Sequence, residues 1–201
     1  MRRRLQLNLA VSATFVLLLT SCSSPSTIIQ TLSDPSVGQV RFHNVLVISV
    51  AGDFASRAQF ERGIAAEFSA GDSAATAYYT VVGRNPQVSR NAIQNAVRSR
   101  GFDAILFVRL KGQDIPGAVA NRPTGSAFNL FLYDYAEFNA ASGIQRDSTA
   151  TFVSELYVAD SEKKIWAIES LIFEHDSAEQ VIENQIKAIA GQLRKDRLIK
   201  N

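Results

Sequence analysis

The fold is decided by two continuous apolar runs, VLVI at residues 45–48 and AILFV at residues 104–108. Runs without alternating polar residues are typical of strands buried on both faces of a sheet. Between them lies AYYTVV at residues 77–82, which is rich in strand-forming residues. Two segments with helical spacing of apolar residues separate the three runs. The order β-α-β-α-β predicts parallel strands joined by right-handed crossovers.

Two helices are expected between these strands. The first is expected to begin at a capping box formed by Ser56 and Gln59 and to end at Gly71. The second is expected to begin at Ser89 and to end at Gly101. The buried faces of the two helices consist of Phe60, Ile64, Phe68, Ile93, Ala96 and Val97.

The second half of the chain predicts a different arrangement. Residues 111–126 are rich in glycine and proline and predict a long loop. Strand-like segments follow at residues 127–138, 148–158 and 164–174. The polar residues 160–163 predict a turn, so we expect the last two strands to form an antiparallel hairpin.

A final helix is expected to begin at a second capping box, formed by Ser177 and Gln180. Its apolar stripe consists of Ile182, Ile186, Ile189, Ala190 and Leu193. Together these segments predict an α/β (α+β) fold. In it, β-α-β-α-β is followed by three antiparallel strands and a C-terminal helix, with helices packed on a single mixed sheet. Residues 40–201 are expected to form one domain.

The first 22 residues have the pattern of an export signal. Arginines occupy residues 2–4, and an apolar stretch follows at residues 9–19. Eleven helical residues span only about 16 Å, roughly half a bilayer core, so a secretory signal is favoured over a permanent membrane span. Serine, proline and glycine in residues 22–39 predict a flexible tether before the domain.

Residues 19–22, Leu19-Thr20-Ser21-Cys22, resemble the lipobox of bacterial lipoproteins. The resemblance implies that residues 1–21 are a signal peptide and that Cys22 carries fatty acyl chains such as palmitate. Two or three acyl chains anchor a protein stably to a membrane, whereas one does not. Ser23 follows the cysteine, where an aspartate would imply inner-membrane retention, so the resemblance implies the periplasmic face of the outer membrane. An ordinary signal peptide with a coincidental cysteine is the alternative.

Composition and charge exclude several classes of protein. The chain is 46% hydrophobic, too apolar for a disordered protein, and its single cysteine excludes a disulfide scaffold. The formal charge of +2 rests on 21 basic and 19 acidic residues. Cleavage before Cys22 removes three arginines, so the mature side chains carry a net charge of −1. We therefore expect no nucleic-acid partner, and we expect no metal or other cofactor.

No pattern of catalytic residues stands out. The chain has no Gly-x-Ser-x-Gly, Walker A or dinucleotide-binding motif. His43 and His175 are interpreted as solvated or structural, and Arg57 with Glu61 as an exposed i,i+4 ion pair. A solvated basic face is expected at Arg90, Arg98 and Arg100.

A partner-binding surface is the functional feature that the sequence favours. Tyr133 and Tyr135 share one face of the strand expected at residues 127–138, with Phe131. This face is either covered core or an exposed aromatic patch suited to a partner. Arg122, in the long loop, is the other expected contact residue.

A wider resemblance covers residues 40–198. Residues 57–61, 101–106, 155–160 and 164–167 resemble small α/β envelope lipoproteins, such as the TolB amino-terminal domain and the LpoB-type activators of penicillin-binding proteins. The resemblance implies a non-enzymatic binding role at the cell envelope. Two alternatives stay open: a subunit of an oligomeric assembly or secretion complex, and an enzyme acting on a cell-wall or lipid substrate.

Overall fold

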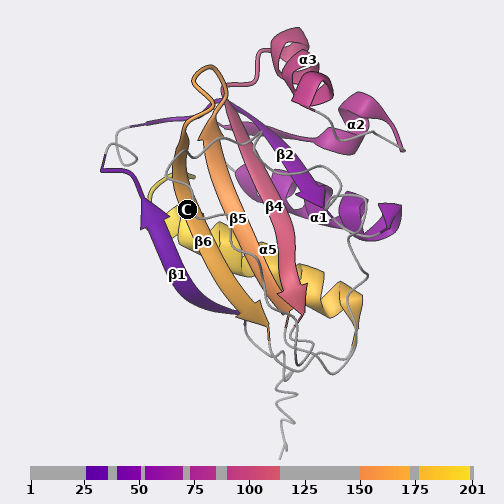
Figure 1. The fold of residues 1–201 in the computed structure, drawn as a ribbon, viewed down its shortest axis with the longest axis vertical. Helices are drawn as coiled ribbons and strands as arrows, with labels where there is room; N and C mark the ends of the chain where they lie inside the picture. The colour runs from indigo at the N-terminus through magenta and orange to yellow at the C-terminus, as the bar shows by residue number, and fades with distance from the viewer. Residues whose placement is uncertain are drawn as a thin grey trace, which may run out of the picture.

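A computed structural model describes residues 26–35, 40–50, 53–69, 73–84, 90–113, 150–172 and 177–199. Its centre is a six-stranded mixed sheet with the strand order β1-β6-β5-β4-β2-β3 (Figure 1). The elements are β1 (Thr27–Ser33), β2 (Asn44–Val50), α1 (Phe54–Phe68), β3 (Ala74–Ala77), α2 (Tyr78–Val82), α3 (Arg90–Arg100), β4 (Ala104–Gln113), β5 (Ala150–Val158), β6 (Lys164–Ile172) and α5 (Ala178–Lys195). The predicted α/β fold with a mixed sheet and a C-terminal helix is confirmed.

The parallel half of the sheet is built on β2. This strand pairs in parallel with β3 on one side and with β4 on the other. Residues 45–48 and 104–108 are buried, as the two apolar runs predict for strands covered on both faces. The predicted β-α-β-α-β order is therefore correct in this region.

The antiparallel half of the sheet contains β4, β5, β6 and β1. β5 and β6 form the predicted hairpin, with Leu156 opposite Trp166. β4 continues to Gln113, so residues 111–113 belong to a strand and not to the predicted loop. The strand predicted at residues 127–138 lies outside the described residues.

The tether prediction for residues 22–39 is wrong at β1. Thr27–Ser33 pairs antiparallel with β6 and forms an edge of the sheet. Ile28 packs against the main core, and the Ser26 hydroxyl donates a hydrogen bond to Gln185 Oε1 of α5 at 3.2 Å. Backbone pairing along β6 and partial burial of Ile28 give this segment a fixed place, which the serine-rich composition of residues 22–39 does not reveal.

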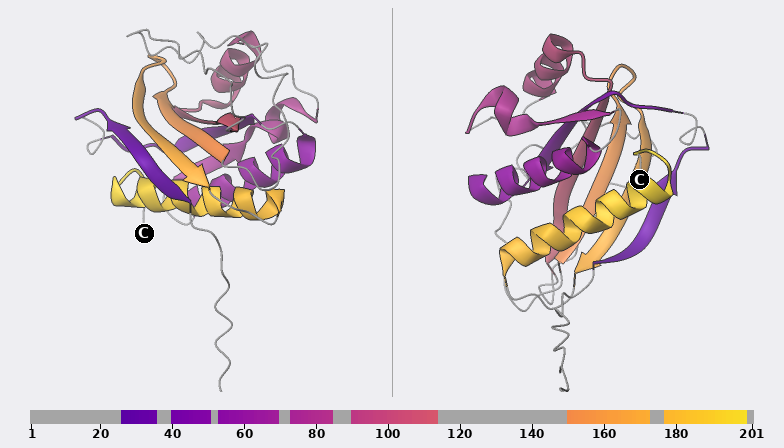
Figure 2. Two further views of the ribbon diagram at one scale, coloured as in Figure 1. Left: turned by 60° about the horizontal axis from the view of Figure 1, so that its bottom comes forward. Right: turned by 180° about the vertical axis from the view of Figure 1, so that it is seen from behind.

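Helices cover both faces of the sheet, as Figure 2 shows from below and behind. α1 and α5 lie on one face and enclose the larger core with Trp166, Leu156 and Leu106. α2 and α3 lie on the other face, over a smaller core that includes Phe107 and Tyr157. Within the described part of the chain, no helix is long and apolar enough to cross a membrane.

Helix ends follow capping chemistry, with two differences from the prediction. α1 ends at Phe68 with Ser69 as its C-cap, and not at Gly71. Asp53, not Ser56, caps α1: its carboxylate accepts the Ser56 backbone N–H at 2.8 Å. The cap of α5 is Ser177, as predicted, and it accepts the Gln180 N–H at 3.1 Å. α3 ends before Gly101, which adopts φ +62° and so needs the conformational freedom of glycine.

The close approach of α1 and α5 depends on Gly63. A Cβ atom at this position would overlap Ile186 Cδ1 of α5. Nearby, Glu67 of α1 and Arg194 of α5 form an ion pair. The absence of a side chain at Gly63 therefore sets how closely the two helices pack.

We expect Gly63→Leu to destabilise the domain by about 2 kcal/mol, because the added side chain overpacks this contact. Ile186→Ala removes the overlapping atoms. The double variant is therefore expected to be more stable than the sum of the two single changes predicts. Urea unfolding of the four proteins measures the coupling, and strictly additive free energies would contradict the packing described.

Candidate functional site

A buried carboxylate, Glu61, lies where α1 crosses the end of β2. Its side chain is fully buried, although it sits on a helix with solvent-exposed neighbours. Oε1 accepts the backbone N–H of Ser49 in β2 at 3.1 Å, and Oε2 accepts the N–H of Tyr79 in α2 at 2.8 Å. One side chain thus joins the helix to two segments of backbone.

The two amides that the carboxylate binds are equivalent positions of neighbouring strands. The parallel ladder between β2 and β3 ends where Val47 pairs with Ala77. If this pairing continued for two more residues, Ser49 would lie opposite Tyr79. Instead of strand-to-strand hydrogen bonds, the N–H groups of both residues donate to the Glu61 carboxylate. This explains why the strand predicted at residues 77–82 is wrong: β3 ends at Ala77 and the chain turns into α2.

Burial raises the pKa of Glu61 to about 7. The amide hydrogen bonds from Tyr79 and Ser49 and the positive charge of Arg57 lower the pKa, but loss of solvent outweighs them. The predicted exposed ion pair between Arg57 and Glu61 is therefore wrong, because the carboxylate faces the sheet and not the solvent.

The sequence contains a signal for this burial. Glu61 lies three residues before Ile64 and seven before Phe68, both buried on the same stripe of α1. A carboxylate on an apolar stripe has to find hydrogen-bond donors inside the protein.

Two arginines and two aromatic rings pack together between α1 and α2. The guanidinium carbons of Arg57 and Arg84 lie 5.4 and 4.9 Å from the centroid of the Phe54 ring. Arg57 Nη2 also donates to the Arg84 carbonyl at 2.8 Å, and Tyr79 meets Phe54 edge-on. This cluster lies near the carboxyl ends of β2 and β3, the edge where ligands bind in many α/β proteins.

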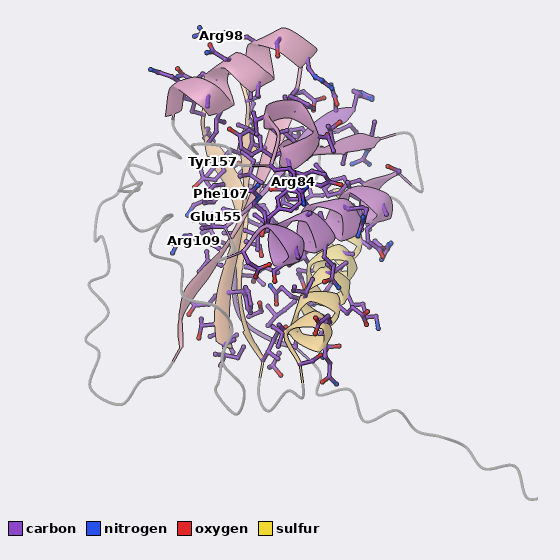
Figure 3. All side chains as sticks on the ribbon, turned by 90° about the vertical axis from the view of Figure 1, so that its right-hand side faces the viewer. Arg84, Arg98, Phe107, Arg109, Glu155 and Tyr157 are labelled. Atoms are coloured by element: carbon purple, nitrogen blue, oxygen red, sulfur yellow. The ribbon has the colours of Figure 1, made fainter. Side chains whose placement is uncertain are left out.

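A second polar cluster lies on the sheet face opposite α5. Lys164 Nζ lies 2.7 Å from Glu155 Oε1, with side chains only 8% and 3% exposed, and Tyr157 donates to Glu155 Oε2 at 3.2 Å. Figure 3 shows Tyr157, Phe107, Glu155 and Arg109 following one another along β4 and β5. An adjacent groove of about 230 Å³ is lined by Leu32, Val153, Glu155, Lys164, Ala167, Ile168 and Glu169.

A third feature is a groove of about 130 Å³ between α3 and the β5–β6 turn. Gln94 Nε2 donates to Glu162 Oε1 across it at 3.0 Å, and Arg98 and Asp160 line its rim. Both grooves are smaller than the roughly 300–1,000 Å³ of typical small-molecule sites.

The contact and attachment residues named from the sequence lie outside the described residues: Cys22, Arg122, Tyr133 and Tyr135. His175 lies outside them too, while His43 is exposed before β2. Arg98 and Arg100 are exposed on α3, as predicted. Among the described ranges, no group of three or more His, Cys, Asp or Glu side chains has the arrangement of a metal site.

No protein-family model matches the chain, and no curated protein matches it. Solved structures with a similar backbone include the PelC dodecamer from Paraburkholderia phytofirmans. It is 10% identical, with coverage of 88% of this chain and 99% of that chain and a TM-score of 0.44. A dodecamer of a PelC point variant from the same organism gives 8% identity, 87% and 99% coverage and a TM-score of 0.47.

The lipoprotein GNA1162 from Neisseria meningitidis is also similar, at 13% identity, with coverage of 75% of this chain and 95% of that chain and a TM-score of 0.41. With TM-scores below 0.5, these likenesses carry no functional conclusion for this chain.

Because folded Glu61 keeps its proton up to about pH 7 and unfolded glutamate loses it above about pH 4.5, the folded state binds more protons between these values. Stability therefore falls as pH rises through this window, by about 3 kcal/mol. Glu61→Gln does not titrate there. We expect the unfolding free energy of the wild type to decrease between pH 4.5 and 7 relative to that of Glu61→Gln. Urea unfolding at several pH values measures both free energies, and a difference that does not change with pH would contradict the burial described.

Proposed function

We propose that this chain is a bacterial envelope lipoprotein, anchored through Cys22 at the periplasmic face of the outer membrane. In this proposal its folded domain binds another envelope component and catalyses no reaction. The observation that carries the proposal is the segment Leu19-Thr20-Ser21-Cys22, which follows a basic start and a short apolar stretch. The only cysteine of the chain stands at the position that the lipobox requires.

The position of the domain supports an anchoring role for Cys22. β1 begins at Thr27, five positions after the cysteine, and so the chain passes almost directly from the proposed lipid into the sheet. An acylated cysteine at this point would hold the folded domain at the membrane rather than at the end of a long tether.

The chemistry of the buried acids supports binding over catalysis. A general acid or base needs a carboxyl oxygen within reach of a substrate. Both oxygens of Glu61 accept backbone amides, and Glu155 interacts with Lys164 and Tyr157. The perturbed pKa of Glu61 is therefore explained by its structural role.

The partner is proposed to contact Arg122, Tyr133 and Tyr135, because an arginine and aromatic residues are enriched where proteins meet. A second copy of this chain is the other candidate partner, as in an oligomeric envelope assembly. Among the described strands β1 forms an edge, and this favours the alternative because the outer backbone groups of an edge strand can pair with another chain.

The proposal is tested in cells with a photo-crosslinking residue placed at Arg122, Tyr133 or Tyr135 in turn, followed by mass spectrometry. We expect reproducible recovery of one envelope protein from these positions, and little from the control position Glu179, which is exposed on α5. Recovery of the chain itself would favour the oligomer. Recovery of no partner from any position would contradict the binding role.

Cys22→Ala is the matched control for anchoring. It is expected to abolish incorporation of labelled palmitate, to leave the signal peptide uncut before residue 22 and to reduce crosslinking to the partner. Equal palmitate labelling of wild type and Cys22→Ala would contradict lipidation at this residue.

A further inference from the structure

The edge strand β1 exposes two large apolar side chains. Ile29 is 49% exposed and Leu32 is 43% exposed, and they are the large hydrophobic residues that stand out at the surface of the described part of the chain. Single exposed apolar residues need no explanation, but two on one strand, close to a proposed lipid anchor, call for a common cause.

Both side chains point away from the core that α1 and α5 cover. Ile28 packs on that core, whereas Ile29 beside it is 49% exposed. Leu32 pairs with Ala167 and lines the groove beside Glu155, on the sheet face opposite α5. A β-bulge between Ile28 and Gln30 makes Ile29 the extra residue of the strand.

The chain length between anchor and strand is short. Ser26 is held by its hydrogen bond to Gln185 of α5, and Thr27 by its pairing with Leu171 of β6. Ser26 is four positions after Cys22, so even a fully extended chain spans at most about 14 Å between them. A lipid on Cys22 would therefore keep the start of β1 within this distance of the bilayer surface.

We propose that β1 lies against the lipid bilayer, with Ile29 and Leu32 at the boundary between headgroups and acyl chains. This inference rests on the proposed lipidation of Cys22. The strand and the lipid then form two adjacent attachments, which fix the orientation of the domain and not only its location.

The depth of β1 is limited by its outer edge. The backbone groups on that edge have no strand partner among the described elements, and they need water or headgroup oxygens for hydrogen bonds. β1 therefore lies at headgroup level, while the two apolar side chains reach deeper. β3 forms the opposite edge of the described sheet, five strand spacings away, so it lies about 24 Å from β1.

The orientation is tested with the lipidated full-length protein in vesicles of phosphatidylethanolamine and phosphatidylglycerol that contain a nitroxide-headgroup lipid. A fluorophore is attached through Thr31→Cys on β1 or Ala74→Cys on β3, both exposed positions; acylation blocks the thiol of Cys22. We expect quenching at position 31 to exceed quenching at position 74 at least three-fold. Equal quenching at both positions would overturn the proposal.

A second comparison tests the two side chains themselves. Adding Ile29→Ser and Leu32→Ser to the Thr31→Cys protein is expected to reduce its quenching at least two-fold, while flotation with the vesicles is unchanged. Thr27→Ser with Ser33→Ala, on the same strand, is the matched control and is expected to leave quenching unchanged. Quenching that survives the loss of both apolar side chains would overturn their role.

These outcomes separate the inference from the proposed function. Flotation with equal quenching contradicts only the orientation. A protein whose mass shows an unmodified Cys22 and which does not float with vesicles contradicts the lipid anchor, and the orientation falls with it.

Discussion

The parallel half of this fold depends on one carboxylate that accepts two backbone amides. Glu61 reaches from α1 to Ser49 of β2 and Tyr79 of α2, at the register position where the two strands would otherwise continue to pair. The carboxylate ends β3 after four residues and allows the chain to turn into α2. Its burial costs stability when it is charged, but removing it would leave two buried amides without an acceptor. The carboxylate supplies the acceptor that these two amides need.

The antiparallel half of the sheet is organised by strand pairing instead. β4, β5 and β6 form a continuous ladder, and β1 extends it to an exposed edge next to the proposed lipid. The two edges of the sheet therefore differ in character. β1 carries exposed apolar side chains beside the proposed anchor, while short β3 is followed by α2 and its arginine–aromatic cluster. A membrane at one edge leaves the other edge and the α3 groove accessible from the periplasm in the proposed orientation.

The sequence predicts those elements that are buried on both faces or closed by capping chemistry. The apolar runs at residues 45–48 and 104–108 predict strands at the centre of the sheet, where both runs are buried. Ser177 marks the start of α5 through its capping hydrogen bond. The strand predicted at residues 77–82 is wrong because Glu61, distant in sequence, binds the Tyr79 amide where the chain turns into α2. β1 is missed because an edge strand with one half-buried side chain, Ile28, has no clear alternation. The site is missed because a glutamate is ordinarily a solvated residue, and only its spacing from Ile64 and Phe68 indicates burial.

Hydrogen exchange of individual amides, followed by NMR, tests most directly whether Glu61 holds β2 and α2 together. We expect Glu61→Leu to accelerate exchange at Ser49 and Tyr79 together, at least ten-fold. The Leu46 amide, in the centre of the sheet, keeps its protection because β2 remains between β3 and β4. Unchanged exchange at both Ser49 and Tyr79 in a folded Glu61→Leu protein would contradict the central role assigned to this carboxylate.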